Sequence, residues 1–202
     1  MFITFEGAEG CGKSTQVNLL REYLLAKGQN VIVTQEPGGT NLGKELRQIL
    51  LNPETILDKT TEIYLFAADR SDHVKKIIQP ALAEGNIVVS DRYIDSTIAY
   101  QVGGRGLPED FVRYINMVSS HGVIPDLTIL LDVSPEVGIK RARARGEVDR
   151  FEKEAIAFHH RVRQAYLTIA QNEAKRVRLV NANEAGIDDV FREIKEVVEE
   201  YL

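Results

Sequence analysis

A glycine-rich segment between an apolar run and an amphipathic run is the feature that most restricts how this chain can fold. Residues 7–14 read Gly-Ala-Glu-Gly-Cys-Gly-Lys-Ser and match the pattern G-x-x-x-x-G-K-[ST] in full. The apolar run Phe2 to Phe5 before it predicts a buried strand, and the stretch Lys13 to Lys27 after it predicts a helix. A strand, a glycine loop and a helix N-terminus in this order form a cradle of N–H groups for phosphate. We therefore expect an α/β fold built around this loop.

The motif also predicts which residues bind a nucleoside triphosphate and its magnesium ion. Lys13 is expected to reach the β- and γ-phosphates, and the hydroxyl of Ser14 is expected to bind Mg²⁺. Asp91 directly follows a second apolar run, where P-loop enzymes hold magnesium with a carboxylate, although a helix N-cap is the alternative role. The residues expected to bind ATP are Gly7, Ala8, Glu9, Gly10, Cys11, Gly12, Lys13, Ser14 and Thr15.

Apolar runs and amphipathic stretches alternate along the rest of the chain. The strands are predicted at 2–5, 30–34, 86–90, 127–132 and 178–180. The helices are predicted at 13–27, 41–51, 60–84 with a kink at Pro80, 108–120, from Pro135, 151–175 and 187–202. This alternation predicts a mostly parallel sheet covered on both faces, with ligands outside the carboxyl ends of its strands. No repeat or linker interrupts the pattern, so one domain over residues 1–202 is expected.

The composition of the chain indicates which kinds of binding partner are excluded. The 202 residues include 25 basic and 30 acidic side chains, for a formal charge of −5. This acidic balance argues against a general nucleic-acid or membrane-surface binder. The single cysteine, Cys11, cannot form an intrachain disulfide, no secretory signal is visible, and no apolar run reaches the ~18–20 residues of a membrane span. We predict a cytoplasmic protein that acts on small molecules, with neither nucleic acid nor membrane as a partner.

Two further segments offer side chains for a second ligand. Arg92 could bind a phosphate with two parallel hydrogen bonds, although a surface ion pair is the alternative. Phe66 and Arg70 are four residues apart on a predicted helix, so a ring and a guanidinium share one face and could hold a base. Further candidates are Glu36, which begins a Glu-Pro-Gly-Gly turn, and the polar groups Ser96, Tyr100 and Gln101. Residues 103–106, Gly-Gly-Arg-Gly, are expected to form a flexible loop with one cation.

The motifs FEGAEGCGKST, QEPGGT, FAADR, DRYIDSTIAYQ, GGRG and RARARGEVDRFE occur in this order, and the chain resembles the thymidylate kinase family over essentially its whole length. The resemblance implies the five-stranded parallel sheet of the nucleoside monophosphate kinases and transfer of phosphate from ATP to dTMP in dTTP biosynthesis. It also implies a homodimer. Phe66 would stack on thymine, Arg70 would hydrogen-bond the base, and Arg92 would hold the dTMP phosphate. Ser96 and Gln101 would lie near the base edge, Tyr100 against the sugar, and Glu9 near the 3′-hydroxyl and the acceptor phosphate.

An arginine-rich segment at about 141–151 is predicted to act as a lid over the site. Phosphoryl transfer spreads negative charge over oxygens, and positioned cations stabilise that charge. The variable positions of the glycine loop hold no arginine, so the chain resembles the bacterial members of the family that supply arginines from the lid. The candidates are Arg141, Arg143, Arg145 and Arg150, with Arg141 and Arg145 preferred; a solvated helix face is the alternative.

Other classes of P-loop protein remain as alternatives. The chain contains neither N-K-x-D nor D-x-x-G, which argues against a GTPase or a related nucleotide switch. A different nucleoside or nucleoside monophosphate kinase of the same fold is the nearer alternative. The histidines His73, His121, His159 and His160 have no spacing typical of a metal site, and we predict structural or surface roles for them.

Overall fold

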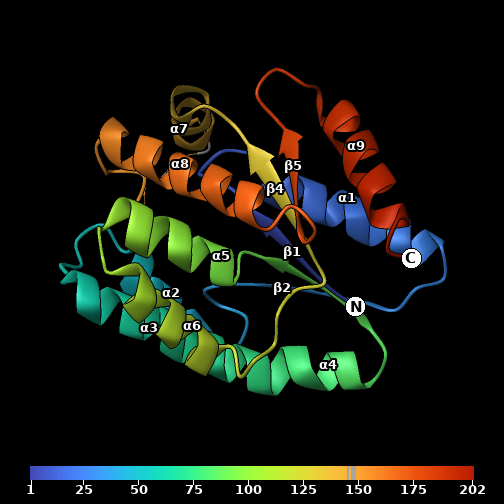
Figure 1. The fold of residues 1–202 in the computed structure, drawn as a ribbon, viewed down its shortest axis with the longest axis horizontal. Helices are drawn as coiled ribbons and strands as arrows, with labels where there is room; N and C mark the ends of the chain where they lie inside the picture. Colours follow the sequence, from blue (N-terminus) through green and yellow to red (C-terminus); the bar gives the residue numbers. More distant parts are fainter. Residues whose placement is uncertain (145, 147–148) are drawn as a thin grey trace.

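The centre of the structure is a sheet of five parallel strands in the order β2-β3-β1-β4-β5. This computed structural model describes residues 1–144, 146 and 149–202. The strands are β1 (Phe2–Glu6), β2 (Val31–Gln35), β3 (Ile87–Asp91), β4 (Leu127–Asp132) and β5 (Val177–Asn181). All four strand pairings are parallel, which confirms the predicted α/β class. Each predicted strand lies within one residue of the observed bounds (Figure 1).

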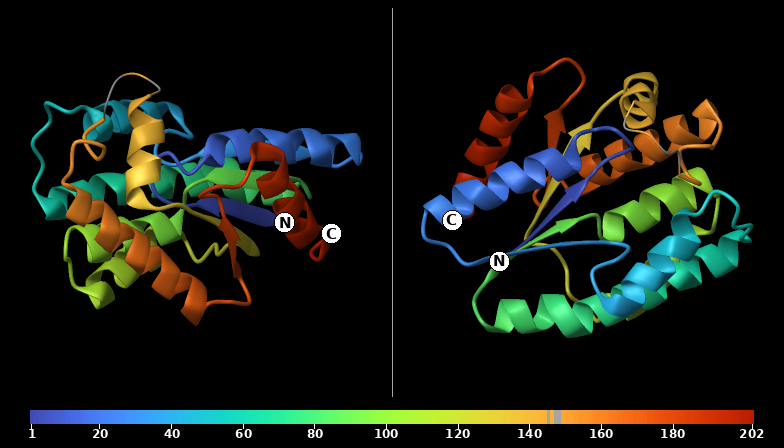
Figure 2. Two further views of the ribbon diagram at one scale, coloured as in Figure 1. Left: turned by 90° about the horizontal axis from the view of Figure 1, so that it is seen from above. Right: turned by 180° about the vertical axis from the view of Figure 1, so that it is seen from behind.

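Helices cover both faces of the sheet. They are α1 (Lys13–Ala26), α2 (Asn41–Leu51), α3 (Lys59–His73), α4 (Gln79–Ala83), α5 (Ile94–Thr97), α6 (Glu109–Ser119), α7 (Pro135–Arg143), α8 (Ile156–Asn172) and α9 (Ile187–Glu199), with two π-helical segments, η1 (Val74–Ile78) and η2 (Ile98–Gly104). Helix α1 crosses one side of the strands, seen from behind in Figure 2. The predicted helix 151–175 was too long, because residues 149–155 form a turn in which Asp149 Oδ1 accepts from the backbone N–H groups of Phe151 and Glu152.

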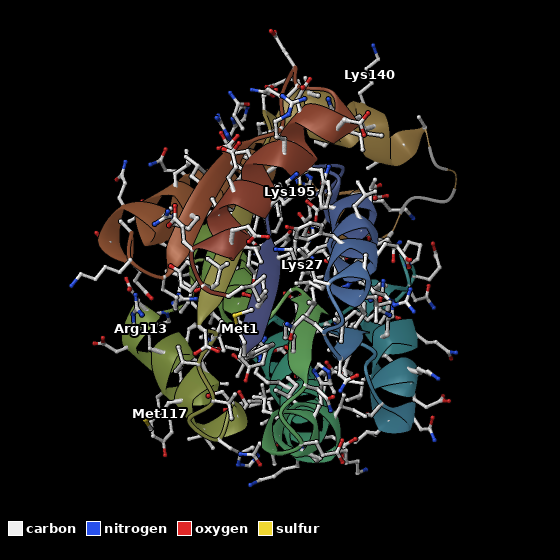
Figure 3. All side chains as sticks on the ribbon, turned by 90° about the vertical axis from the view of Figure 1, so that its right-hand side faces the viewer. Met1, Lys27, Arg113, Met117, Lys140 and Lys195 are labelled. Atoms are coloured by element: carbon white, nitrogen blue, oxygen red, sulfur yellow. The ribbon has the colours of Figure 1, made fainter. Side chains whose placement is uncertain are left out.

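Alternation along the strands divides the core into two layers. Ile3 and Phe5 of β1 face α1 and α9 in one apolar cluster. Phe2 points to the opposite face, where it packs with residues of η1, α4 and β3. Helices α1 and α9 lie side by side, and Lys27 and Lys195 both reach over the ring of Tyr23 between them (Figure 3). The closing helix therefore belongs to the core through its apolar stripe of Val190, Ile194 and Val198.

The helical stretch predicted at 60–84 is divided by a π-helical turn. Helix α3 runs into η1 and then into α4, where Pro80 lies in the first turn. In the wider turn the N–H of Gln79 donates to the carbonyl of Val74, five residues earlier. Because Pro80 has no N–H and its ring crowds the preceding turn, a local widening lets the helix continue. The irregularity expected at Pro80 is therefore present as a π turn.

The prediction of a flexible loop at 103–106 is wrong for Gly103 and Gly104. Gly103 and Gly104 end η2, and this segment packs closely on α8. A methyl group on Gly104 would lie 2.5 Å from Phe158 Cε2, and one on Gly103 would lie 2.7 Å from Ala165 Cβ. The glycines thus permit two helices to approach, and Arg105 is held in ion pairs with Glu62 and Glu154.

Among the described residues, no helix combines the length and apolar character required to cross a bilayer.

Candidate active site

The glycine loop follows the central strand β1 and leads into α1, as predicted. Gly7 and Gly10 have φ values of 138° and 68°, in the region that favours glycine. A Cβ on Gly7 would lie 2.4 Å from the carbonyl oxygen of Leu131, and one on Gly10 2.0 Å from that of Gly138. The loop is therefore pressed against the end of β4 and against α7, and only glycine fits at these two positions.

Lys13 turns its ammonium group back over this loop. Its Nζ donates to the carbonyl oxygens of Gly7 at 3.0 Å and Ala8 at 3.1 Å, and it lies 3.4 Å from Cys11 Sγ. The side chain is buried although it carries a positive charge. A buried cation beside a ring of backbone N–H groups is the arrangement that binds polyphosphate.

Ser14 and Asp91 meet at the carboxyl edge of the sheet. Ser14 Oγ donates to Asp91 Oδ2 at 2.9 Å, although 77 positions separate the two residues. A hydroxyl and a carboxylate are oxygen ligands of the kind that Mg²⁺ prefers, and magnesium commonly takes its other ligands from water and phosphate. Among the described residues, no group of three or more His, Cys, Asp or Glu side chains could hold a metal by itself. The pair thus fits magnesium bound together with a phosphate.

The guanidinium of Arg92 lies at the centre of the site. Arg92 has a φ of 72°, so its backbone turns sharply where β3 ends. Its Nη1 donates to the carbonyl of Gly7 at 3.0 Å, to Ser96 Oγ at 3.1 Å and to Tyr166 OH at 3.1 Å. Its Nη2 donates to Tyr100 OH at 3.1 Å. These contacts fix the fork of the guanidinium beside the glycine loop, where it could bind an acceptor phosphate.

Glu9, a variable position of the loop, projects toward Arg92. Its Oε1 lies 3.5 Å from Arg92 Nη2 and accepts from Tyr100 OH. Its Oε2 lies 3.4 Å from Nδ1 of the buried His159. Burial raises the pKa of Glu9, but the contact with His159 and the charge of Arg92 outweigh it and lower the pKa to about 2. Glu9 is therefore an anion at neutral pH, and it can orient a hydroxyl or a cation.

Glu6 is the last residue of β1 and contacts the residues around Arg92. Its carboxylate accepts from the backbone N–H of Tyr93 at 2.8 Å, from Ser96 Oγ at 2.5 Å and from Tyr166 OH at 3.1 Å. Burial, together with the charge of Asp95, raises the pKa of Glu6 to about 7. Through Ser96 and Tyr166, this buried carboxyl supports the two hydroxyls that contact Arg92.

Helix α3 contributes a second cation that is almost completely buried. Arg70 is 2% exposed, and its Nε and Nη2 both lie 2.8 Å from Glu36 Oε2. Its Nη1 donates to Thr97 Oγ1 at 2.8 Å and Asn116 Oδ1 at 2.7 Å. Glu36 Oε1 lies 2.8 Å from His73 Nδ1. This network joins the turn after β2 to α3, α5 and α6.

One cavity of about 240 Å³ joins these groups. It contains all seven residues predicted to bind the second substrate: Glu36, Phe66, Arg70, Arg92, Ser96, Tyr100 and Gln101. From the glycine loop and the magnesium pair it contains Glu9, Gly10, Gly12, Lys13, Ser14, Thr15 and Asp91. The two sets of predicted residues therefore open into the same space.

The arginines predicted for the lid are placed differently. Arg141 lies on α7 and donates to the carbonyl oxygens of Ala182 at 2.9 Å and Asn183 at 2.8 Å, outside the cavity lining. Arg145 lies outside the described residues. Arg150 contacts the carboxylate of Glu62 and the carbonyl of Leu50. The structure thus does not bring Arg141 to the cavity, and its predicted contact with the transferred phosphoryl group stays a prediction.

Several residues of the site were not found from the sequence. Arg47 lines the cavity and donates to the carbonyl of Pro37 at 2.7 Å. Tyr166 and His159 reach the site from α8, and the structural role predicted for His159 did not include its contact with Glu9. Glu6 had a usable signal, because it is a charged residue at the end of an apolar strand that leads into the glycine loop. No sequence pattern connects α8 to the loop.

Known proteins with similar sequences and folds share one description. A family model for thymidylate kinase matches residues 5–194. The thymidylate kinase of Maridesulfovibrio salexigens is 50% identical over 210 residues, covering 100% of this chain and 96% of that protein. That of Trichodesmium erythraeum is 45% identical and covers 88% of this chain and 86% of its own length. The crystal structure of thymidylate kinase from Ehrlichia chaffeensis has a TM-score of 0.82 at 35% identity, with 98% of each chain covered.

The fold and the site define a P-loop kinase of the nucleoside monophosphate class. Within that class, the chain belongs to the thymidylate kinase family. This membership confirms the fold and the activity predicted from the sequence, which is the phosphorylation of dTMP. The enzyme is accordingly a transferase of nucleotide biosynthesis.

Proposed function

We propose that the chain transfers the γ-phosphoryl group of ATP to the phosphate of dTMP, with Mg²⁺, through the residues that line the cavity of about 240 Å³. The observation that carries the proposal is the position of Arg92, whose guanidinium lies between the glycine loop and the predicted nucleoside pocket. ATP would bind at Gly7 to Thr15. The monophosphate would bind at Glu36, Phe66, Arg70, Arg92, Ser96, Tyr100 and Gln101.

The chemistry requires charge and alignment rather than a general base, because the acceptor is already an anion. Lys13 would bind the β- and γ-phosphates of ATP, and Arg92 would hold the acceptor phosphate beside them. Glu9 would orient the deoxyribose 3′-hydroxyl, which its low pKa permits because it stays an acceptor at neutral pH. Ser14 and Asp91 would hold magnesium, which neutralises phosphate charge when bound.

Arg141 and Arg145 are proposed as further cations toward the transferred group, in keeping with a lid at about residues 141–151. In the structure Arg141 donates to the carbonyl oxygens of Ala182 and Asn183 after β5. We propose residues 181–185 as the region that contacts adenine, from their position after the last strand. Arg141 would therefore act from the ATP side of the site. An Arg141→Ala variant with unchanged kcat would remove it from the catalytic set.

A homodimer is proposed from the surface of α6. Tyr114 and Met117 are 60% and 58% exposed, and Val118 is exposed beside them. Arg113 and Met117 project from the outer side of this helix (Figure 3). Adjacent apolar side chains on one helix face are typical of a subunit interface. A Met117→Glu variant should lower the mass measured by light scattering to that of a monomer.

We also propose a cytoplasmic location for the protein.

The proposed reaction is tested by measuring ADP release in a coupled assay with ATP and Mg²⁺. The acceptors compared are dTMP, dUMP, dCMP, dGMP and thymidine. We expect the strongest stimulation of ADP release by dTMP. The response to dUMP should be weaker, because one methyl group in an apolar pocket is worth about 1–3 kcal/mol. Thymidine should give no stimulation, because it lacks the acceptor phosphate. Faster ADP release with thymidine would indicate a nucleoside kinase. ADP release that no acceptor changes would refute transfer to any of them.

A further inference from the structure

The amide of Gln101 lies between the cavity and a buried carboxylate. Gln101 is one of the residues that line the cavity, and it is almost completely buried. Its Nε2 donates to Glu62 Oε1 at 2.7 Å. Its Oε1 is buried and has no hydrogen-bond partner among the described residues. A buried carbonyl oxygen without a partner is costly unless a ligand supplies the donor.

Glu62 itself does not line the cavity, but it is fixed firmly behind it. It is 1% exposed, and it lies one helical turn before Phe66 and two turns before Arg70 on the same face of α3. Arg105 donates through Nε to Glu62 Oε1 at 3.0 Å and through Nη2 to Oε2 at 3.1 Å. Arg150 also donates to Oε2. Two guanidinium groups therefore hold the carboxylate in one orientation.

The chemistry of this contact decides which end of the Gln101 amide faces the ligand. An ionised carboxylate only accepts hydrogen bonds, whereas an amide has one donor end and one acceptor end. The NH₂ end must therefore face Glu62, and the carbonyl end is left for the cavity. If the amide turned over, its Oε1 would face the carboxylate oxygens of Glu62, and two acceptors would meet in a buried site.

We propose that Glu62 is a positioning residue for base selection, because it locks the Gln101 amide with its carbonyl oxygen toward the substrate. This orientation favours a base that presents an N–H donor at this edge, as thymine and uracil do at N3. It disfavours cytosine, whose N3 accepts. The inference rests on the proposed function, in which Gln101 contacts the base, and it adds the residue that gives this contact its polarity.

The test compares the Glu62→Gln enzyme with the wild type, with dTMP and dCMP as acceptors. A glutamine at this position can donate to a turned amide, so Gln101 can then present its NH₂ group to the base. We expect the ratio of kcat/KM for dTMP to that for dCMP to fall by about tenfold, the scale of one mismatched buried hydrogen bond. The change should lie mainly in KM. A folded Glu62→Gln enzyme that loses activity equally on both acceptors would overturn the proposal.

Two further variants separate positioning from general support. Arg105→Gln removes a partner of Glu62 without altering the contact between Glu62 and Gln101, so it should lower stability and leave the acceptor ratio unchanged. In a Gln101→Leu background, Glu62→Gln should have no additional effect on the ratio. If Gln101→Leu alone leaves the ratio unchanged while dTMP remains the best acceptor, Gln101 does not select the base. If dTMP is not preferred by the wild type, the proposed function fails instead.

A measurement on the wild-type enzyme tests the same idea without a change at Glu62. The side-chain NH₂ resonances of Gln101, assigned by their loss in Gln101→Leu, report its hydrogen bond to the carboxylate. We expect these protons to remain protected from exchange with solvent when dTMP is added. Loss of that protection on dTMP binding would show that the amide turns, and it would refute the lock.

Discussion

The buried pair of Arg70 and Glu36 provides a strong prediction about stability. The two side chains are each 3% exposed, and Arg70 also donates to Thr97 and Asn116. Arg70→Ala would leave the Glu36 carboxylate buried with His73 Nδ1 as its remaining side-chain contact among those described above. Removing one member of a buried pair costs about 3–5 kcal/mol, since the other charge stays desolvated. We expect Arg70→Ala to reduce the free energy of unfolding by that amount.

The assay is urea unfolding at pH 7, followed by far-UV circular dichroism. The matched control is Arg113→Ala, which removes the exposed pair with Glu109, where the side chains are 50% and 53% exposed. That change should cost less than about 0.5 kcal/mol. The double variant Arg70→Met/Glu36→Gln should recover at least half of the loss, because it leaves no unpaired charge. A loss below about 1 kcal/mol for Arg70→Ala, or one equal to that of the control, would refute the reasoning.

The remaining predictions concern a buried acid and a close helix contact. The pKa of Glu6 is raised from 4.5 to about 7 in the folded state, so folded protein binds the carboxyl proton more tightly than unfolded protein does. The stability that this proton binding contributes is therefore lost as the pH rises from 4.5 to about 7. Glu6→Gln should therefore be more stable relative to the wild type at pH 8 than at pH 5, and an equal difference at both pH values in urea titrations would contradict this. Gly104→Ala should cost about 1–3 kcal/mol, because its methyl group would meet the Phe158 ring. The control Gly186→Ala meets only the end of one flexible side chain. Equal melting temperatures for the two variants would contradict the close approach.

The parts of the site that follow from local rules could be predicted from the sequence. The glycine loop needs only its neighbouring strand and helix, and Asp91 follows from its place at the end of a strand. Phe66 and Arg70 open into one cavity because a four-residue spacing puts them on one helix face. Each of these inferences uses residues fewer than twenty positions apart.

The missed contacts depend on how distant helices pack. Tyr166 and His159 reach Arg92 and Glu9 only because α8 lies closely against η2, and that approach depends on glycines whose motif also fits a loop. The side chain of Arg141 is directed by backbone carbonyls after β5, which carry no sequence signal. Such contacts arise from tertiary packing, so helical spacing alone could not identify them.

The strand order has a consequence for how the chain acquires its nucleotide site. Strand β1 comes first in the chain, yet it lies at the centre of the sheet between β3 and β4, which begin at residues 87 and 127. During synthesis at roughly 5–20 residues per second, β1 and the glycine loop must wait several seconds before both neighbours exist. Fragments that end before β4 lack the backbone against which Gly7 is pressed. A nascent chain therefore gains a complete phosphate cradle only after more than half of its length has been translated.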